Sequence, residues 1–276
     1  MDDLLSRWLG LREAADARAR SEWLTRTIAV TLPAGGEPVH VLDLATGTGS
    51  NVRYLSPRLP SPQRWLAVDR RADLLAELRG RTAGLTCEVD TREGDLGALD
   101  DPAIFAGRHL VTASALLDLV SEPWLQSVAA RCRAERASAL FTITYNGRSS
   151  CDPVDPDDHV VLQLFNQHQR RDKGLGGPAT GPGGAQVAER SFTQAGYRVI
   201  CEPSDWMLGP ADADMQRMLI DGWAEAGAET DPEQTDAIAA WRVRRLAHVD
   251  RGCSRIRVGH DDLAAWLPAD GTVRPR

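Results

Sequence analysis

The sequence predicts an α/β fold, a doubly wound and mostly parallel seven-stranded sheet with helices on both faces. Apolar runs rich in Val, Leu and Ala alternate with segments of helical periodicity, a rhythm typical of βαβ units. Strands of a parallel sheet are buried on both faces, which explains runs that are nearly continuous in apolar residues. The first run, 39–45, leads directly into the turn TGTGS at 46–50, where glycines allow a ligand to approach the backbone.

The first 38 residues are predicted to form a helical cover that packs on the sheet. Apolar and small side chains recur there at helical spacing in two stripes: Leu4, Trp8, Leu11 and Ala15, then Trp23, Thr27 and Val30. One or two helices therefore precede the first strand.

Five strands and their connecting helices are expected between residues 39 and 147. Short apolar runs predict the strands at 39–45, 64–71, 85–96, 108–120 and 137–147. Helical periodicity predicts the helices at 50–59, 72–84 and 123–135. Pro57 interrupts the first of these helices, and Gly84 ends the second.

The pattern changes after Gly147. Residues 148–186 combine an acidic, Pro-containing start, a helix from about Asp158 and a Gly/Pro-rich loop. This connection is too long for an ordinary loop of a compact domain, so we expect residues 148–186 to form a lid that includes a substrate-binding loop. The remaining segments predict a helix at 188–197, a strand at 198–208, a helical insertion at 209–250, and a last strand and tail at 254–276.

Composition and charge argue against a membrane protein, a secreted protein and a nucleic-acid-binding protein. With 276 residues and 42% hydrophobic content, the chain can form a single domain over 1–276. No apolar run approaches the ~20 residues of a membrane span, and the N-terminus does not resemble a secretory signal, so we expect a cytoplasmic protein. Five scattered cysteines favour reduced thiols. A net charge of -7 argues against a nucleic-acid surface, and the basic run at 241–246 is interpreted as a solvated helix face.

The glycine turn fits a dinucleotide site poorly. Such a site needs three glycines spaced G-x-G-x-x-G, and Gly47 and Gly49 supply only the first two, because Val52 stands at the third position. Asp43 lies inside the strand two residues before the turn, where its charge would repel a pyrophosphate. An NAD(P)-dependent oxidoreductase therefore remains an alternative and is not the favoured interpretation.

The same stretch resembles motif I of the class I, Rossmann-like S-adenosylmethionine-dependent methyltransferases. An acid in the first strand is followed there by small residues at alternate positions, and here these are Asp43, Ala45, Gly47 and Gly49. The resemblance implies that S-adenosyl-L-methionine is the cofactor and that Asp43 holds the turn from below. Ala45 departs from the pattern, because many members have glycine at that position.

Further positions match the resemblance at the ends of the next strands. Asp69, followed by Arg70, ends the second strand and would accept hydrogen bonds from both ribose hydroxyls. Asp95 and Leu96 follow the third strand and resemble the family's adenine site. Ser114, at the end of the fourth strand, would line the methionine arm of the cofactor.

The cofactor's carboxylate needs a cation that the strand-end motifs do not supply. Arg12 or Arg20 of the N-terminal helices is the candidate for this contact. The fourth strand lacks the Asn/Asp-Pro-Pro-aromatic tetrad with which amino-methylating enzymes of this family grip a nucleic-acid base. Together with the acidic charge, this makes a nucleic-acid substrate unexpected.

Candidate substrate residues follow the fourth and fifth strands. Asp118 could face the substrate as a catalytic group or cap the following helix. Tyr145 and Arg148 follow the fifth strand at the carboxyl edge, where open α/β sheets bind their ligands. Either a contact with substrate or a structural role is compatible with their positions.

The loop 165–184 carries the strongest substrate candidates. His168, Arg171 and Lys173 lie within six residues, and the glycines after them expose backbone amides suited to an anion. Lys173 is the single lysine among 32 basic residues, so it is interpreted as orienting the acceptor, with His168 as a base if the acceptor is a hydroxyl. A flexible hydrophilic loop is the alternative. This loop, with its HQRxDKG pattern, resembles a loop in a group of bacterial methyltransferase-like proteins.

The acidic stretch 152–159 is interpreted as a helix start and not as a metal site. Asp157 or Asp158 would cap the helix and interact favourably with its dipole. We therefore predict no metal.

The sequence as a whole predicts methyl transfer from S-adenosyl-L-methionine to a small polar or anionic metabolite. A protein that binds the cofactor without methyl transfer is a second alternative. The expected partner is a small-molecule substrate, with no nucleic acid and no membrane, and the chain is expected to be a monomer or a homodimer.

Overall fold

The computed structural model describes residues 2–97, 99 and 101–268. Its strands form an eight-stranded sheet of order β3-β2-β1-β4-β5-β8-β6, with the short β7 paired to β8 outside this path. The strands are β1 (Val39–Leu44), β2 (Gln63–Asp69), β3 (Glu88–Glu93), β4 (Leu110–Ser114), β5 (Ser138–Asp152), β6 (Arg198–Pro203), β7 (Trp206–Leu208) and β8 (Arg255–Trp266). Neighbours from β3 to β5 are parallel, and β8 is antiparallel to β5, β6 and β7. The predicted doubly wound, mostly parallel sheet is confirmed, and β7 is an addition to it.

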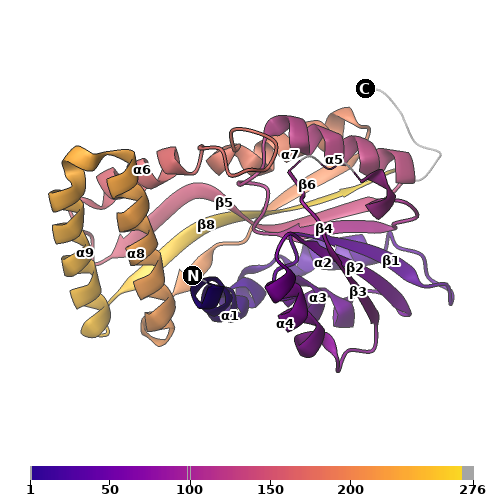
Figure 1. Ribbon diagram of the computed structural model, residues 1–276, viewed down its shortest axis with the longest axis horizontal. Helices are drawn as coiled ribbons and strands as arrows, with labels where there is room; N and C mark the ends of the chain where they lie inside the picture. Colours follow the sequence, from indigo (N-terminus) through magenta and orange to yellow (C-terminus); the bar gives the residue numbers. More distant parts are fainter. Residues whose placement is uncertain (1, 98, 100, 269–276) are drawn as a thin grey trace.

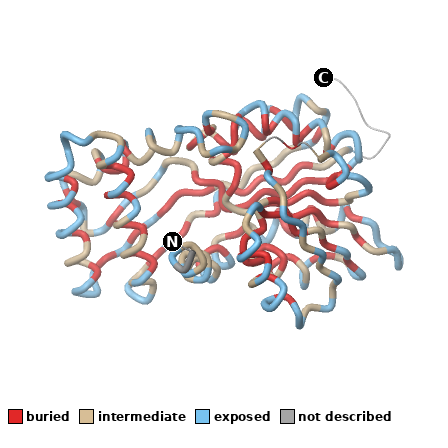
Figure 2. The backbone as a smooth tube through the Cα atoms, viewed as in Figure 1, coloured by how far each residue is buried: buried red, intermediate tan, exposed pale blue. Residues whose placement is uncertain are grey.

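Helices cover both faces of the sheet (Figure 1). They are α1 (Asp2–Ala19), α2 (Glu22–Ala29), α3 (Ser50–Leu55), α4 (Ala72–Thr82), α5 (Glu122–Glu135), α6 (Asp158–His168), α7 (Gly184–Gln194), α8 (Ala213–Thr230) and α9 (Thr235–Asp250). In β1, Val39 and Val41 pack with α2 and α3, whereas Leu42 and Leu44 pack with α5 and α7. The central strands are therefore buried on both faces (Figure 2), as the continuous apolar runs predict.

Strands β5 and β8 extend past the rest of the sheet as an antiparallel ribbon that carries α6, α8 and α9 at one end of the molecule (Figure 1). Two register shifts interrupt their pairing, after Phe141 and after Tyr145. β5 ends at Asp152 and not at Gly147, so the first residues of the predicted lid are strand. The reason is pairing: Ser149 to Asp152 lie opposite alternating buried and exposed residues of β8.

Other predicted boundaries also changed. The N-terminal helices pack on strands of the sheet as expected, α2 on β5 and β8 and α1 on β7, and α1 also packs on α8. The expected strand 198–208 is two strands, because Ser204 and Asp205 leave the β6 ladder and hydrogen-bond to the backbone of His260. The last strand continues to Trp266. Among the described residues, no helix has the length and apolar character needed to cross a lipid bilayer.

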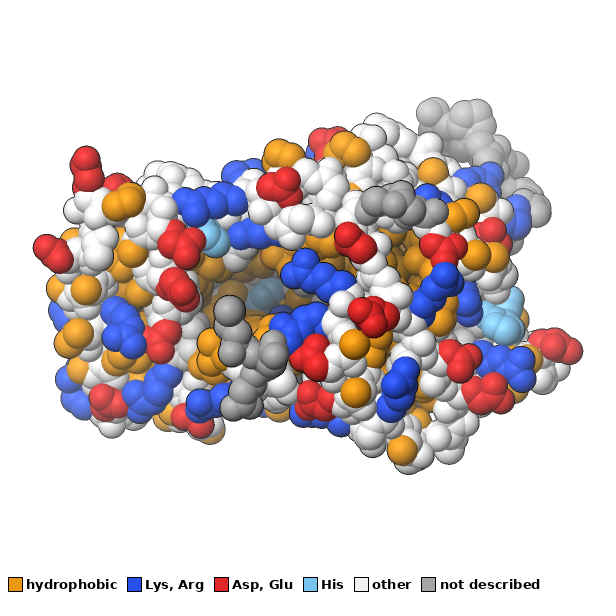
Figure 3. Space-filling model, in the orientation of Figure 1, with side chains coloured by type: hydrophobic (Ala, Val, Ile, Leu, Met, Phe, Trp, Pro, Cys, Tyr) orange, Lys and Arg blue, Asp and Glu red, His pale blue; other side chains and the backbone are white. Residues whose placement is uncertain are grey.

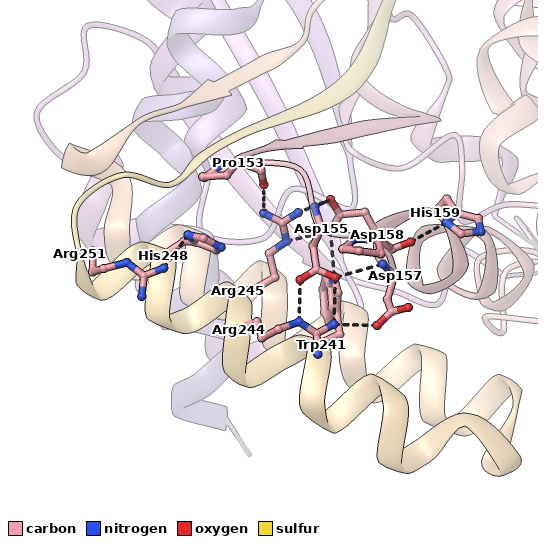
Figure 4. Close-up of polar contacts among 11 residues, drawn as sticks. Pro153, Asp155, Asp157, Asp158, His159, Trp241, Arg244, Arg245, His248 and Arg251 are labelled. Atoms are coloured by element: carbon pink, nitrogen blue, oxygen red, sulfur yellow. Dashed lines mark hydrogen bonds and ion pairs between the residues drawn. The ribbon is translucent and has the colours of Figure 1, made fainter.

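An ion-pair cluster joins α6 to α9 at the helical end (Figure 4). The guanidinium of Arg245 is fully buried, donates from Nε to Asp158 Oδ1 at 2.8 Å, and also bonds the carbonyl of Pro153. Arg244 bonds Asp155 and Asp157. The interpretation of 241–246 as a solvated helix face is therefore wrong for Arg245, which is buried, whereas Arg244 is exposed although it pairs with the acids of the preceding stretch.

The same contacts explain the acidic stretch 152–159. Asp157 occupies the N-cap position of α6 without a side-chain capping bond, and Asp158 accepts from the backbone N–H of Asp155. The expected capping by these two side chains is therefore corrected to pairing with arginine. No cluster of three or more potential metal ligands occurs within residues 2–97, 99 and 101–268.

Candidate functional site

The turn after β1 is held from inside the protein by Asp43. This fully buried carboxylate accepts from Thr46 Oγ1 at 2.5 Å and from Asn51 Nδ2 at 2.6 Å. Burial raises the pKa of Asp43 to about 6, and the two hydrogen bonds oppose the shift. Ala45 and Gly47 both adopt positive φ, at 52° and 55°. The turn therefore needs left-handed backbone, which Gly47 adopts without strain and Ala45 does not.

Asp69 lies at the end of β2, opposite this turn. Its Oδ2 accepts from the backbone N–H of Gly47 at 2.8 Å, and its Oδ1 accepts from that of Arg71 at 3.0 Å. Each carboxylate oxygen has a second lone pair, so the side chain can accept further hydrogen bonds from a ligand.

The two glycines of the turn have different neighbours. A Cβ atom on Gly47 would lie 3.2 Å from Leu9 Cδ1, because α1 crosses over the turn. A Cβ atom on Gly49 would lie 2.7 Å from Leu78 Cγ, which belongs to α4. Gly47 therefore lies between the sheet and α1, whereas Gly49 allows α3 and α4 to approach each other.

A cavity of about 300 Å³ lies at the carboxyl ends of β1, β2 and β4. We call it the strand-end cavity. Its walls are Leu5, Trp8, Leu9, Arg12, Ala45, Gly47, Asp69, Arg70, Arg71, Leu74, Leu96, Ser114, Ala115, Leu116, Leu119 and Leu175. Of the residues expected to bind the cofactor, six are in this set: Ala45, Gly47, Asp69, Arg70, Leu96 and Ser114. Asp43 lies behind the turn, against a small adjoining cavity of about 40 Å³.

Besides Asp43, three expected cofactor residues are not in this wall. Gly49 packs against α4, and Asp95 is exposed, with its Oδ1 accepting from the N–H of Gly97 at 2.8 Å. Arg20 is buried and donates to Asn51 Oδ1 at 2.6 Å and to Ser114 Oγ at 3.0 Å. Arg20 therefore supports the wall from behind.

Helix α1 contributes one face to the strand-end cavity. Leu5 is three residues from Trp8 and four from Leu9, and Arg12 is four residues from Trp8 and three from Leu9, so the four side chains share that face. The guanidinium of Arg12 forms an ion pair with Asp16, with 3.0 Å from Nε to Oδ2. Of the two arginines considered for the cofactor carboxylate, only Arg12 lines this cavity.

The Gly-rich loop after α6 closes the strand-end cavity on another side. Leu175 lines it, and the carbonyl of Leu175 accepts from the N–H of Ser121 at 3.1 Å. A Cβ atom on Gly97 would lie 2.6 Å from the carbonyl oxygen of Gly174, which shows how closely the loop packs on the β3–β4 connection. Part of the expected lid therefore forms an apolar wall beside Leu96.

A second, larger cavity of about 670 Å³ opens between α1, α6 and α8. We call it the helix cavity. It is lined by Leu4, Leu5, Trp8, Arg71, Phe165, Met218, Leu219, Gly222 and Trp223. Three of these residues, Leu5, Trp8 and Arg71, also line the strand-end cavity. Figure 3 shows a hollow with hydrophobic side chains inside it and Lys or Arg side chains at its border.

Aromatic rings pack against one another in and behind the wall of the helix cavity. The ring of Trp206 contacts Trp8 and His260, with centroids 6.0 and 4.4 Å apart, and Tyr145 contacts Phe165 at 5.4 Å. Burial lowers the pKa of His260 to about 3, so this side chain is a neutral part of the packing. This aromatic wall was not expected from the sequence, in which only the helical spacing of Trp8 pointed to it.

The expected substrate residues His168, Arg171 and Lys173 gather around Glu229 of α8. His168 Nε2 lies 3.0 Å and Arg171 Nη1 3.5 Å from Glu229 Oε2, and Lys173 Nζ lies 3.4 Å from His168 Nδ1. Partial burial, together with the neighbouring positive charges, lowers the pKa of both His168 and Lys173. None of the three lines either cavity, and their roles toward an acceptor stay predictions.

Of the other expected substrate residues, Asp118 and Tyr145 are neighbours, because the backbone of Tyr145 hydrogen-bonds to the Asp118 carboxyl group, whereas Arg148 lies on the surface. The hydroxyl of Tyr145 is buried and donates to Asn166 Oδ1 at 2.8 Å. Arg148 is exposed and pairs with Asp261 at 3.4 Å. Asp118 is buried, and burial raises its pKa to about 6. None of these residues lines the two cavities.

The chain shares its fold with known methyltransferases. Phosphoethanolamine N-methyltransferase 2 of Haemonchus contortus, solved with phosphomonomethylethanolamine and S-adenosylhomocysteine, is 12% identical at a TM-score of 0.50. The match covers 96% of this chain and 58% of that chain. The YcgJ protein of Bacillus subtilis is 13% identical at a TM-score of 0.48, with 89% and 98% of the two chains covered. At 12% identity, the likeness to the Haemonchus contortus enzyme establishes the fold alone.

One family model matches part of the chain. No curated protein sequence matches this chain. Residues 41–135, which run from β1 through α5, match the family model described as a methyltransferase domain. This match covers about a third of the chain and shows that residues 41–135 are similar to a methyltransferase domain.

Proposed function

We propose that this protein transfers the methyl group of S-adenosyl-L-methionine to a small polar or anionic molecule. The cofactor would occupy the strand-end cavity. There Asp69 accepts hydrogen bonds from the ribose hydroxyls, and Leu96 and Leu175 contact the adenine ring. Positive φ at Gly47 brings bare backbone to the cavity wall, which suits the close approach of a ligand.

The charges of the strand-end cavity support this orientation of the cofactor. Arg12 offers a guanidinium to the cofactor carboxylate from the face of α1 that lines the cavity. Ser114 at the end of β4 lines the same cavity, and its hydroxyl is fixed by the bond from Arg20. The methionine arm would therefore lie between α1 and β4.

The chemistry requires alignment more than acid–base catalysis. When bound, the cofactor supplies an electrophilic methyl group on a positively charged sulfur. A lone pair on the acceptor forms the new bond to the methyl carbon, and the electrons of the broken carbon–sulfur bond stay on sulfur, which leaves S-adenosylhomocysteine. This chain must hold the acceptor in line behind the methyl group, and a base is needed only if the acceptor arrives protonated.

One observation carries the proposal: the strand-end cavity and the helix cavity share the residues Leu5, Trp8 and Arg71. Two adjoining cavities are what a reaction between a cofactor and a second molecule requires. Their charged wall residues include three arginines, Arg12, Arg70 and Arg71, and one acid, Asp69. Arg12 pairs with Asp16 and Arg71 with Asp73, and arginines at this wall suit an acceptor with an anionic group.

Calorimetry and a transfer assay test the proposal. Titration with S-adenosylhomocysteine should give saturable binding, and titration with NAD should give none. With methyl-labelled S-adenosylmethionine, the protein should then transfer label into a metabolite extract. Binding without any transfer would identify a cofactor-binding protein, and binding of NAD instead would identify an oxidoreductase.

A further inference from the structure

A glycine in the middle of α8 forms part of the wall of the helix cavity. Gly222 lies well inside the 18-residue helix, where glycine is the poorest helix former after proline. A Cβ atom on Gly222 would meet no atom within 4 Å, so packing against protein does not require glycine there. Any side chain at this position would project into open space at the cavity wall. The bare backbone at Gly222 therefore widens the helix cavity.

The rest of the wall suits a flat apolar group. Trp8, Phe165 and Trp223 bring ring surfaces from α1, α6 and α8, and the rings of Phe165 and Trp223 have centroids 6.2 Å apart. Leu4, Leu5, Met218 and Leu219 make up most of the remainder, and no acidic residue of the described chain lines the cavity. Aromatic side chains stack favourably on flat rings, and the surrounding aliphatic groups exclude water from both.

The charged end of the cavity faces the cofactor. Arg71 lies on the wall that the two cavities share, and Arg12 and Arg70 line the adjoining strand-end cavity. A ligand that fills the helix cavity therefore meets aromatic rings on the wall and one arginine, Arg71, which also pairs with Asp73, at the boundary with the strand-end cavity. The volume of about 670 Å³ falls within the range of cavities that enclose small organic ligands.

We infer that the methyl acceptor is a flat, ring-bearing carboxylate, with its rings in the helix cavity and its carboxylate toward Arg71. This inference rests on the proposed function, because it assigns the acceptor to the cavity beside the cofactor. Gly222 is the residue that admits the ring system. A bulky side chain there occupies the space of the rings and leaves the strand-end cavity unchanged.

The test uses the full chain saturated with S-adenosylhomocysteine and 2-naphthoate as the probe, titrated by calorimetry. We expect 2-naphthoate to bind more tightly than decanoate, which lacks rings, and than 2-naphthylmethylamine, which carries the opposite charge. Gly222→Leu should weaken 2-naphthoate binding by about tenfold or more. Gly80→Leu is the matched control, because Gly80 is a helical glycine of α4 that is exposed, also meets no neighbour and lines neither cavity.

Each outcome has a defined meaning. Both variants should keep the melting temperature and the affinity for S-adenosylhomocysteine, because leucine favours helix more than glycine does. Equal binding of decanoate or of the amine, no binding of 2-naphthoate, or an unchanged affinity in Gly222→Leu overturns the inference while the cofactor still binds. Failure of the wild-type protein to bind S-adenosylhomocysteine overturns the proposed function itself.

Discussion

Asp69 combines two tasks in one side chain. It accepts from the backbone N–H groups of Gly47 and Arg71, and it lines the strand-end cavity. We expect Asp69→Ala to weaken S-adenosylhomocysteine binding by about 2 to 4 kcal/mol, because two hydrogen bonds to a charged acceptor are lost. Glu93→Ala, which removes an exposed acid at the end of neighbouring β3, is the calorimetric control and should bind normally.

The same substitution should also lower stability. The backbone N–H groups of Gly47 and Arg71 lose their acceptor, at a cost of about 1 to 3 kcal/mol in the free energy of unfolding. Asp69 therefore supports the turn after β1 as well as the ligand. An unchanged affinity in a folded Asp69→Ala protein would remove this residue from the cofactor site.

Asp118 makes stability depend on pH. Burial raises its pKa from the usual 3.8 to about 6, and the charges of Arg12 and Lys173 only partly oppose this. Between these values the folded state binds more protons than the unfolded state, so stability from this group falls as pH rises from about 4 to 6. Above that range the loss is complete, at roughly 3 kcal/mol. The Asp118→Asn variant has no carboxyl group to ionise at this position, so its free energy of unfolding does not fall in this way.

Denaturant unfolding at several pH values tests the role of Asp118. The difference in unfolding free energy between Asp118→Asn and wild type should shift in favour of the variant between pH 4 and 7. The raised pKa of Asp43 also contributes to the wild-type slope, but it is present in both proteins and cancels in the difference. A difference that stays constant over this range would contradict the raised pKa of Asp118.

The residues at the strand ends were predictable, and those of the helix cavity were not. Asp43, Gly47 and Asp69 are recognisable because each stands at a fixed offset from a strand, and local sequence determines that offset. Phe165 and Trp223 belong to helices far apart in the chain and meet only in the tertiary structure. Their apolar character marks them as buried, but it does not reveal which cavity they share.

At the scale of elements, helix α1 covers one side of the strand-end cavity. Its Asp16 accepts a hydrogen bond from Trp206 Nε1 at 2.9 Å, which fixes the helix to β7. Its lining face ends in Arg12, the candidate for the cofactor carboxylate. We expect Arg12→Gln to weaken S-adenosylhomocysteine binding by about 1.5 to 3 kcal/mol, as for a lost charged hydrogen bond. Calorimetry measures the affinity.

Arg18→Gln provides the matched control on the same helix. Arg18 is exposed and pairs with Asp212, so its replacement removes an equal charge from α1 without touching the cavity. We expect its affinity to stay within about twofold of wild type, because exposed ion pairs contribute little. Equal losses in both variants would mean that the helix acts through its overall charge and that Arg12 makes no specific contact.

Strand lengths show where local patterns stop being sufficient. The apolar run of β5 ends near Gly147, and the polar residues Ser149 and Ser150 after it resemble a loop. They are strand because β8 offers them a partner, in which Ile256 and Val258 are buried and Arg255 and Arg257 exposed. Pairing between residues more than a hundred positions apart determines this extension, and no local signal predicts it.

At the scale of the whole molecule, the ribbon of β5 and β8 makes the core and the helical end continuous. Both strands run through the two parts, so neither part can unfold without disrupting strands of the other. We therefore expect one cooperative thermal transition, and a defect at the helical end should lower the stability of the entire protein. The buried pair of Arg245 and Asp158 offers a place to test this coupling.

Arg245→Ala should lower the single melting temperature by roughly 6 to 10 °C. Removal of one partner leaves the acid of a buried pair uncompensated, which costs about 3 to 5 kcal/mol, and each kcal/mol corresponds to about 2 °C in a chain of this size. Arg242→Ala is the control on the same helix: its pair with Asp221 is exposed, so the melting temperature should change by no more than about 2 °C. Differential scanning calorimetry of both variants measures these melting temperatures and the number of transitions. Two separate transitions in Arg245→Ala would mean that the helical end unfolds independently of the sheet, despite the strands that run through both.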